Sequence, residues 1–444
     1  MLRHLMSKVG NLDHHIQEIL KKGALALLLK IISAALIFGF NVLLARLIGA
    51  EGAGVYFLAM TVASIATLFG RVGLDDSLVR FTAANVELKN WSAVKGVYRQ
   101  GMLLALGTST LTALIVWIFA SPIAEKIFSK PELTSPLQWI SLSIVPTSLL
   151  ILHGQMLQGL KRITEYILVQ WQGIIVSVIS IIGILLLGTR WGTLGAIWAF
   201  IISTVLTAIF GFWRWRAATP QLKNVAAEFN FNDLVKSCMP LFWVTTLNYI
   251  VNTGSTPILI GMWWTNKDVS IYSVATRTAQ LTSLILIAIN AIVAPKFAAL
   301  YSKGELQTLG KVARQSALIG TIVAGPLLLI ALIFPEQVMG IYGQEFVRGS
   351  SVLIIMAIGQ FINVAVGSVA YLLKMCGHEN RLKRLSISSA IINTILNVSL
   401  IPLFGIVGAA MADSLTLIYR NIWSAFLVRK YININLSFFA KSAN

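Results

Sequence analysis

The most regular feature of the sequence is a series of apolar runs separated by short polar segments. Each run is long enough to cross a bilayer as one helix, which takes about 20 residues. Membrane-spanning strands would instead show weaker segments of alternating polarity, about 10 residues each. The pattern predicts about twelve transmembrane helices, at roughly 24–45, 53–74, 99–120, 136–157, 167–188, 192–213, 238–262, 269–293, 315–334, 350–373, 385–402 and 405–428.

The composition agrees with a chain that lies almost wholly within a membrane. Of the 444 residues, 57% are hydrophobic and 12% are charged, and the mean hydropathy is +0.79, whereas soluble domains carry about 25% charged residues. The first apolar run follows a polar stretch, residues 1–23, and no small-residue cleavage site comes after it. We therefore expect a retained helix rather than a removed signal peptide, in an all-α integral membrane protein.

The distribution of positive charge predicts the orientation of the chain. The two termini and the even-numbered connections between predicted helices hold most of the 35 Lys and Arg residues. Positive residues stay on the cytoplasmic side of a membrane, so we expect both termini in the cytoplasm. The net charge of +18 is spread over short loops that face an anionic leaflet, which accounts for it without a nucleic-acid partner.

The second half of the sequence repeats the pattern of the first. Tyr56 in GAGVYFLAM matches Tyr272 in DVSIYSVAT, and GTLGAIWAF at 192–200 matches GIVGAAMAD at 405–413. We expect two six-helix lobes, residues 1–220 and 221–444. Because each lobe has an even number of spans, both enter the membrane from the same side and form parallel repeats. Transporters place a central substrate cavity between such repeats.

Polar residues recur on single faces of several predicted helices. Their spacing of three or four residues places them on one stripe, and polar groups at membrane depth normally face the bundle interior or a water-filled cavity. A purely structural alternative is that they join helices by hydrogen bonds worth about 0.6 kcal/mol each. The candidate substrate-binding amides are Asn41, Asn248, Asn252, Gln280, Gln360 and Asn363.

Charged side chains within the predicted helices are stronger candidates, because a lone Lys or Arg at a helix centre costs roughly 2.5–3.5 kcal/mol. Lys30, Arg71 and Arg277 are candidates for an anion-binding surface, although snorkelling or structural pairing would also explain them. Asp413 is the one acidic residue placed well inside a predicted helix, and Arg420 follows two turns later. The two either pair structurally or form a site that titrates during transport.

Other kinds of chemistry find little support in the sequence. Cys238 and Cys376 lack the spacing of a metal site, and the histidines do not form the two-histidine helical signature of zinc proteases. The predicted connections are too short for a soluble catalytic domain. We expect neither an enzyme nor a metal centre nor a bound cofactor, with H⁺ or Na⁺ as the candidate coupling ion.

Residues 43–81, LLARLIGAEGAGVYFLAMTVASIATLFGRVGLDDSLVRF, resemble the Wzx-type polysaccharide flippases of bacterial cell envelopes. The resemblance lies in an Ala-Arg-x-x-Gly junction, a Gly-x-Tyr entry to the second helix and a Gly-Leu-x-x-Ser-x-x-Arg-Phe exit. That family shares a superfamily with the multidrug and toxin extruders and the lipid II flippase. The resemblance implies that an oligosaccharide on undecaprenyl pyrophosphate is turned across the bacterial inner membrane by alternating access, for O-antigen, capsule or exopolysaccharide synthesis.

The resemblance also implies partners and leaves alternatives open. The implied partners are the lipid-linked oligosaccharide, membrane lipids, a polysaccharide polymerase and a chain-length regulator. The first alternative is a cation-coupled multidrug exporter on the same scaffold, which the buried basic residues disfavour. The second is a membrane-embedded glycan polymerase or ligase, which generally carries a long extracytoplasmic loop. A non-transporting assembly partner would have no need of repeated polar stripes.

Overall fold

A computed structural model describes residues 14–170, 173–228, 230–249 and 255–434 of the protein. These residues form helices joined by short turns and contain no strand. The principal helices are α2 (His14–Arg71), α3 (Leu74–Glu87), α4 (Trp91–Ile118), α6 (Thr134–Ser141), α7 (Ile144–Gly159), α8 (Ile163–Val169), α9 (Ile174–Gly183), α10 (Thr189–Ala218), α11 (Phe231–Tyr249), α12 (Ser255–Trp263), α13 (Asn266–Gln280), α14 (Ser283–Ser302), α15 (Leu306–Ile333), α16 (Pro335–Gly340), α17 (Ser350–Val366), α18 (Val369–Met375) and α19 (Glu379–Ile432).

Three of these helices are broken by a glycine. Non-helical backbone occurs at Gly49 in α2, Gly192 in α10 and Gly405 in α19, with φ of 70°, 54° and 58°. Glycine adopts this left-handed region without the steric cost that other residues incur. The breaks at Gly49 and Gly405 divide α2 and α19 into two arms, whereas the break at Gly192 lies near the start of α10 and separates it from α9.

The helices confirm the prediction of an all-α membrane fold. Among the described residues, six helical segments are long and apolar enough to cross a membrane, or seven if the bent pair Pro131–Ser141 and Ile144–Gly159 is one span. Three of the six are 47, 56 and 53 residues long, and each covers two predicted spans. The predicted spans fall mainly on helices, apart from 171–172 and 250–254, which lie outside the described residues.

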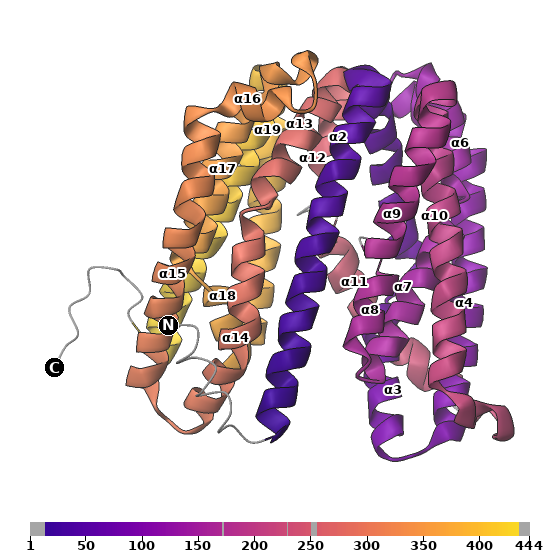
Figure 1. The fold of residues 1–444 in the computed structure, drawn as a ribbon, viewed down its shortest axis with the longest axis vertical. Coiled ribbons are helices and arrows are strands. Elements are labelled where there is room, and N and C mark those ends of the chain that lie inside the picture. Colours follow the sequence, from indigo (N-terminus) through magenta and orange to yellow (C-terminus); the bar gives the residue numbers. More distant parts are fainter. Residues whose placement is uncertain (1–13, 171–172, 229, 250–254, 435–444) are drawn as a thin grey trace.

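The helices of the first and second halves lie on opposite sides of the molecule. Figure 1 shows α4 and α6 to α10 on one side and α14 to α19 on the other, with α2 and α13 between them. We call the end where α2 begins and α19 finishes the terminal end. The opposite end, which contains Gly49, Asn266 and α16, is called the far end. The ribbons of the two halves diverge towards the terminal end in Figure 1.

Helices α11 and α12 connect the two halves. The Oγ atoms of Ser237 in α11 and Ser77 in α3 lie 3.1 Å apart, so α11 packs on the first half. The indole nitrogen of Trp264, directly after α12, donates to the carbonyl of Ile401 in α19 at 3.0 Å. Helix α12 therefore packs on the second half.

Candidate functional site

A polar cavity of about 530 Å³ lies between the two halves. Its walls come from α2 on one side and from α11, α12, α13, α14, α17 and α19 on the others. Hydroxyl, amide and charged groups dominate its polar lining, which consists of Asn41, Thr61, Ser64, Tyr249, Tyr272, Ser273, Thr276, Arg277, Gln280, Ser283, Tyr342, Gln360, Asn393, Asp413, Thr416 and Arg420. This volume is within the range of small-molecule sites, about 300–1,000 Å³.

Arg277 in α13 presents its guanidinium to the cavity. The side chain is exposed to the cavity space, and its Cζ lies 4.7 Å from the centroid of the Phe57 ring in α2. Its Nη1 approaches the Oδ1 of Asn41, which is 2% exposed, at 3.5 Å. A planar guanidinium that keeps free donors can bind phosphate or carboxylate through paired hydrogen bonds.

Asp413 in α19 is held by a network of hydrogen-bond donors. Its Oδ1 accepts from the hydroxyl of Thr256 at 3.0 Å and from the amides of Asn393 and Asn397 at 2.8 and 3.2 Å. Its Oδ2 accepts from the hydroxyl of Tyr272. Because these groups all donate, they match a carboxylate, which can only accept hydrogen bonds. Hydroxyl and amide oxygens beside a carboxylate are also the ligands that hard cations prefer.

Tyr342 closes the cavity towards the far end. Its ring meets Phe38 of α2 edge to face, with centroids 5.7 Å apart, and its hydroxyl oxygen lies 2.7 Å from that of Thr278 in α13. Only 1% of Tyr342 is exposed. The Tyr342 ring therefore joins both halves at the end of the polar cavity that faces the far end.

Beyond Tyr342, polar contacts seal the halves at the far end. The amide of Asn266, 2% exposed, donates to the carboxylates of Glu51 and Glu132 at 2.9 Å each. Gly54 permits this approach, because a Cβ there would lie 1.8 Å from the carbonyl oxygen of Asn266. The cavity is consequently shut on this side of the molecule.

Comparison with known proteins identifies the chain. The model of the family described as "Polysaccharide biosynthesis protein" matches residues 19–301, more than half of the 444 residues. The chain belongs to the polysaccharide biosynthesis protein family. A second family model, MatE, matches residues 240–399 of the chain.

Individual relatives agree with this assignment. The probable low-salt glycan biosynthesis flippase Agl15 of Haloferax volcanii is 24% identical over 89% of the chain and 80% of its own length. The lipid II flippase MurJ in an inward closed conformation superposes with a TM-score of 0.73, at 15% identity over 91% of this chain and 87% of that one. An inward-facing multidrug resistance MATE transporter gives 0.70, at 13% identity over 92% and 96%.

The family match and these relatives agree with the prediction of an all-α, multi-pass membrane protein. They also agree with the flippase family that the sequence resembles. The two solved structures share its fold at low sequence identity, so they establish its architecture alone.

The structure brings together six of the residues that were selected from the sequence. The cavity is lined by Asn41, Arg277, Gln280, Gln360, Asp413 and Arg420. Lys30 and Asn363 lie on α2 and α17 outside this lining, and the Asn363 amide approaches the Gln360 oxygen at 3.5 Å. The side chain of Asn248 and the whole of Asn252 lie outside the described residues.

Arg71 also lies outside the main cavity, at the end of α2. Its guanidinium pairs with the carboxylate of Asp75, and their side chains are 12% and 15% exposed. It borders a separate void of about 30 Å³ within the first half. Asp75 follows the predicted span 53–74, so helical spacing within that span gave no sign of the pair.

Three residues that shape the site are among those that reasoning from the sequence did not select. Tyr272 served only to align the repeats, and Thr256 and Tyr342 were not selected. Thr256 and Tyr272 bind Asp413 from α12 and α13, far from α19 in sequence. A search for hydroxyl groups opposite the single intramembrane carboxylate would have included both.

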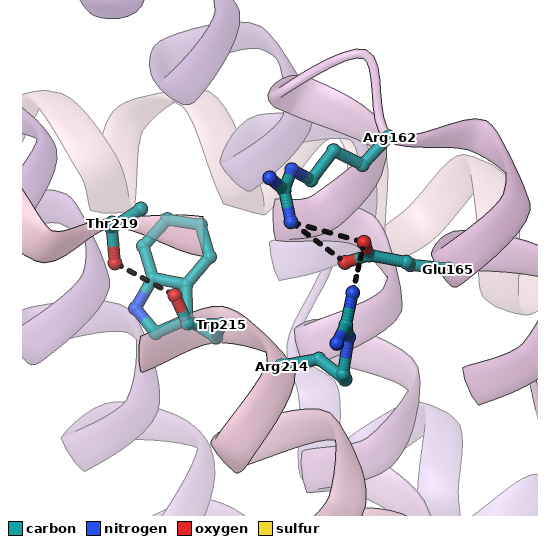
Figure 2. Close-up of polar contacts among 5 residues, drawn as sticks. All are labelled: Arg162, Glu165, Arg214, Trp215 and Thr219. Carbon is teal, nitrogen blue, oxygen red and sulfur yellow. Dashed lines mark hydrogen bonds and ion pairs between the residues drawn. The ribbon is translucent and has the colours of Figure 1, made fainter. Parts of the chain in front are cut away.

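A second charged cluster braces the first half at the terminal end, away from the cavity. Figure 2 shows Glu165 between Arg162 and Arg214, with nitrogen–oxygen distances of 3.0 and 2.5 Å to its Oε1. The same view shows the Thr219 hydroxyl donating to the Trp215 carbonyl at 2.8 Å. Because Glu165 links α8 to α10, the cluster fixes helices within one half instead of lining the site.

Proposed function

We propose that this protein translocates a lipid-linked oligosaccharide across the membrane by alternating access. The observation that carries the proposal is the polar cavity between the two halves, closed at the far end and bearing Arg277 on its wall. Family membership and the similarity to a probable glycan biosynthesis flippase support it.

The cavity offers what the polar part of such a substrate needs. Sugar hydroxyls require hydrogen-bond partners when they leave water, and an unpaired polar group in an apolar medium costs several kcal/mol. The amides of Asn41, Gln280 and Gln360 can supply them. The guanidinium of Arg277 matches the negative charge of the phosphate that joins a glycan to its lipid carrier.

The finer proposal concerns the carrier and the membrane. The sequence resemblance and the distribution of positive charge favour undecaprenyl pyrophosphate in the bacterial inner membrane, with both termini cytoplasmic and O-antigen, capsule or exopolysaccharide as the product. With that orientation, the closed far end makes this the conformation that receives substrate from the cytoplasm. A polysaccharide polymerase and a chain-length regulator would be its partner proteins. The curated glycan flippase that it resembles is archaeal, so undecaprenyl and dolichyl carriers should be compared directly.

Coupling to an ion gradient is a separate part of the proposal. Asp413 is the candidate coupling residue, with H⁺ or Na⁺ as the ion, and Arg420 lines the same cavity on the same helix. Protonation would remove the charge that four donors now stabilise, whereas Na⁺ would replace those donors with its own attraction. Either event changes the hydrogen bonds that join α12, α13 and α19.

A multidrug exporter is the second candidate, favoured by the MatE match and by a carboxylate in the cavity. Such an exporter needs a cavity whose net charge attracts a cationic substrate. Asp413 already accepts hydrogen bonds from four side chains, and Arg277 and Arg420 line the same cavity. The charge of the site therefore favours an anionic substrate over a cationic drug.

Flipping by the purified protein in proteoliposomes tests the proposal. A fluorescent lipid-linked oligosaccharide is incorporated, and a membrane-impermeant reductant then measures how much of it reaches the outer leaflet. We expect transport by the wild type and by Arg80→Ala, an exposed position on α3, and loss of transport in Arg277→Ala. If the wild type moves no lipid-linked glycan but extrudes cationic dyes, the exporter is the better assignment.

A further inference from the structure

Helix α12 is only nine residues long and is held at both ends by other parts of the protein. At its start, the hydroxyl of Thr256 donates to Asp413 at 3.0 Å. At its end, the ammonium of Lys130 donates to the carbonyl oxygen of Gly261 in the last turn and to that of Trp264 directly after the helix, the latter at 2.7 Å. Lys130 belongs to the first half, whereas Asp413 belongs to the second.

The contact of Lys130 with the carbonyl end of α12 holds this helix to the first half. The last carbonyl groups of a helix have no partner within it, and the helix dipole places partial negative charge there. Lys130 supplies a cation and is only 9% exposed. Burial lowers the pKa of this ammonium, and the carboxylates of Glu132, Glu51 and Asp268 oppose that decrease. Nearby acidic groups thus compensate the charge at the seam between the halves.

The packing around α12 leaves little freedom between the two attachment points. Gly261 lies against Leu58 of α2, and a Cβ at Gly261 would approach Leu58 Cδ1 to 2.8 Å. Thr256 and Ile260 are buried. A rigid turn-and-a-half of helix transmits a displacement at Thr256 to its carbonyl end, because a helix rises 1.5 Å per residue without compressing.

We propose that α12 couples the state of Asp413 to the closure of the far end, with Lys130 as the gating residue. The inference rests on the proposed coupling role of Asp413 and adds the path by which it acts. When Asp413 is protonated or occupied by a cation, the hydrogen bond from Thr256 loses its charge assistance and weakens. Helix α12 then shifts away from the Lys130 ammonium, and the far end opens.

Accessibility of the cavity from the far end tests this coupling without any substrate. Ile37, which lines the cavity, is replaced by cysteine in a background carrying Cys238→Ser and Cys376→Ser. A membrane-impermeant maleimide is added outside proteoliposomes, and labelling is counted only for molecules whose C-terminal tag is protected inside. Those molecules present their far end to the reagent.

The expected labelling rates distinguish the role of Lys130 at the far end from its coupling to Asp413. Lys130→Met should raise the labelling rate about tenfold, within the usual range of coupling between sites, whereas Lys126→Met, exposed on the same connection, should leave it unchanged. Asp413→Asn should also raise it. Because both act through α12, the double variant should label no faster than Lys130→Met alone.

Two outcomes would overturn the inference. Wild-type labelling in Lys130→Met, with a melting temperature and a Lys130→Arg control that show intact folding, would remove Lys130 from the gate. If the labelling rate of the double variant rose by the product of the two single increases, the two sites would act independently. Neither outcome depends on glycan transport, so a failure of the flipping assay alone would count against the proposed substrate and not against this coupling.

Discussion

The guanidinium of Arg277 lies over the ring of Phe57, 4.7 Å from its centroid. The two residues come from α13 and α2, the helices at which the halves meet. A cation over an aromatic face gains about 0.5–2 kcal/mol, more when it is desolvated. The ring thus holds the charge at the cavity wall and leaves the N–H groups of the guanidinium edge available to a ligand.

Replacing Phe57 by leucine should therefore weaken transport without abolishing it. The change removes the aromatic face but keeps an apolar side chain, so we expect a loss of about threefold to thirtyfold in transport rate at low substrate concentration. The flipping assay with a substrate titration measures this. Met60→Leu, a volume-conserving change in the same cavity wall, should have little effect, and an equal loss in both variants would point to general disruption.

Arg277→Lys should not recover the transport that is lost in Arg277→Ala. Lysine keeps the positive charge but lacks the planar fork that binds phosphate through two parallel hydrogen bonds. Measurement of flipping in the Lys and Ala variants distinguishes charge from geometry. Full activity in Arg277→Lys would show that a point charge suffices at this wall.

Asp413→Asn should reduce the dependence of transport on an imposed ion gradient. The amide cannot ionise, and its NH₂ group faces donors that now point at a carboxylate. Initial flipping rates measured with and without a proton or sodium gradient give the comparison. An unchanged gradient response in a folded variant would leave Asp413 a purely structural role.

Arg71→Ala should destabilise the protein instead of changing its substrate. Removal of one partner from a largely buried ion pair leaves the other charge uncompensated, at a cost of about 3 kcal/mol. We expect a lower melting temperature and partial recovery in Arg71→Ala/Asp75→Ala, with transport per folded molecule close to wild type. Loss of transport at normal stability would return Arg71 to the candidate site.

Gly405→Ala should lower stability at the break in α19. Gly405 has φ of 58°, and a Cβ there would lie 3.1 Å from the Trp264 ring. The left-handed conformation alone costs a residue with a Cβ roughly 1–2 kcal/mol. Thermal unfolding in detergent should show the decrease, whereas Gly325→Ala, with open space around it, should be neutral or slightly stabilising.

Six of the eleven candidate residues that the sequence suggested line the cavity, because helical spacing reveals which side chains share a face. Arg277 and Gln280, three residues apart on α13, both line the cavity. The same reasoning grouped Arg71 with them, because it treats each helix alone. Arg71 instead pairs with Asp75 across the turn after α2, a contact that depends on how the backbone bends there.

The sequence by itself determined that this protein is a bundle of membrane helices, because a backbone in lipid must satisfy its own hydrogen bonds and only long apolar helices do so here. It also placed polar faces on those helices. Only the tertiary structure decided which faces meet. Tyr272 and Asp413 are 141 residues apart, and Lys130 lies 134 residues before Trp264. Such partners are chosen by the packing of whole helices, which the periodicity within each helix does not encode.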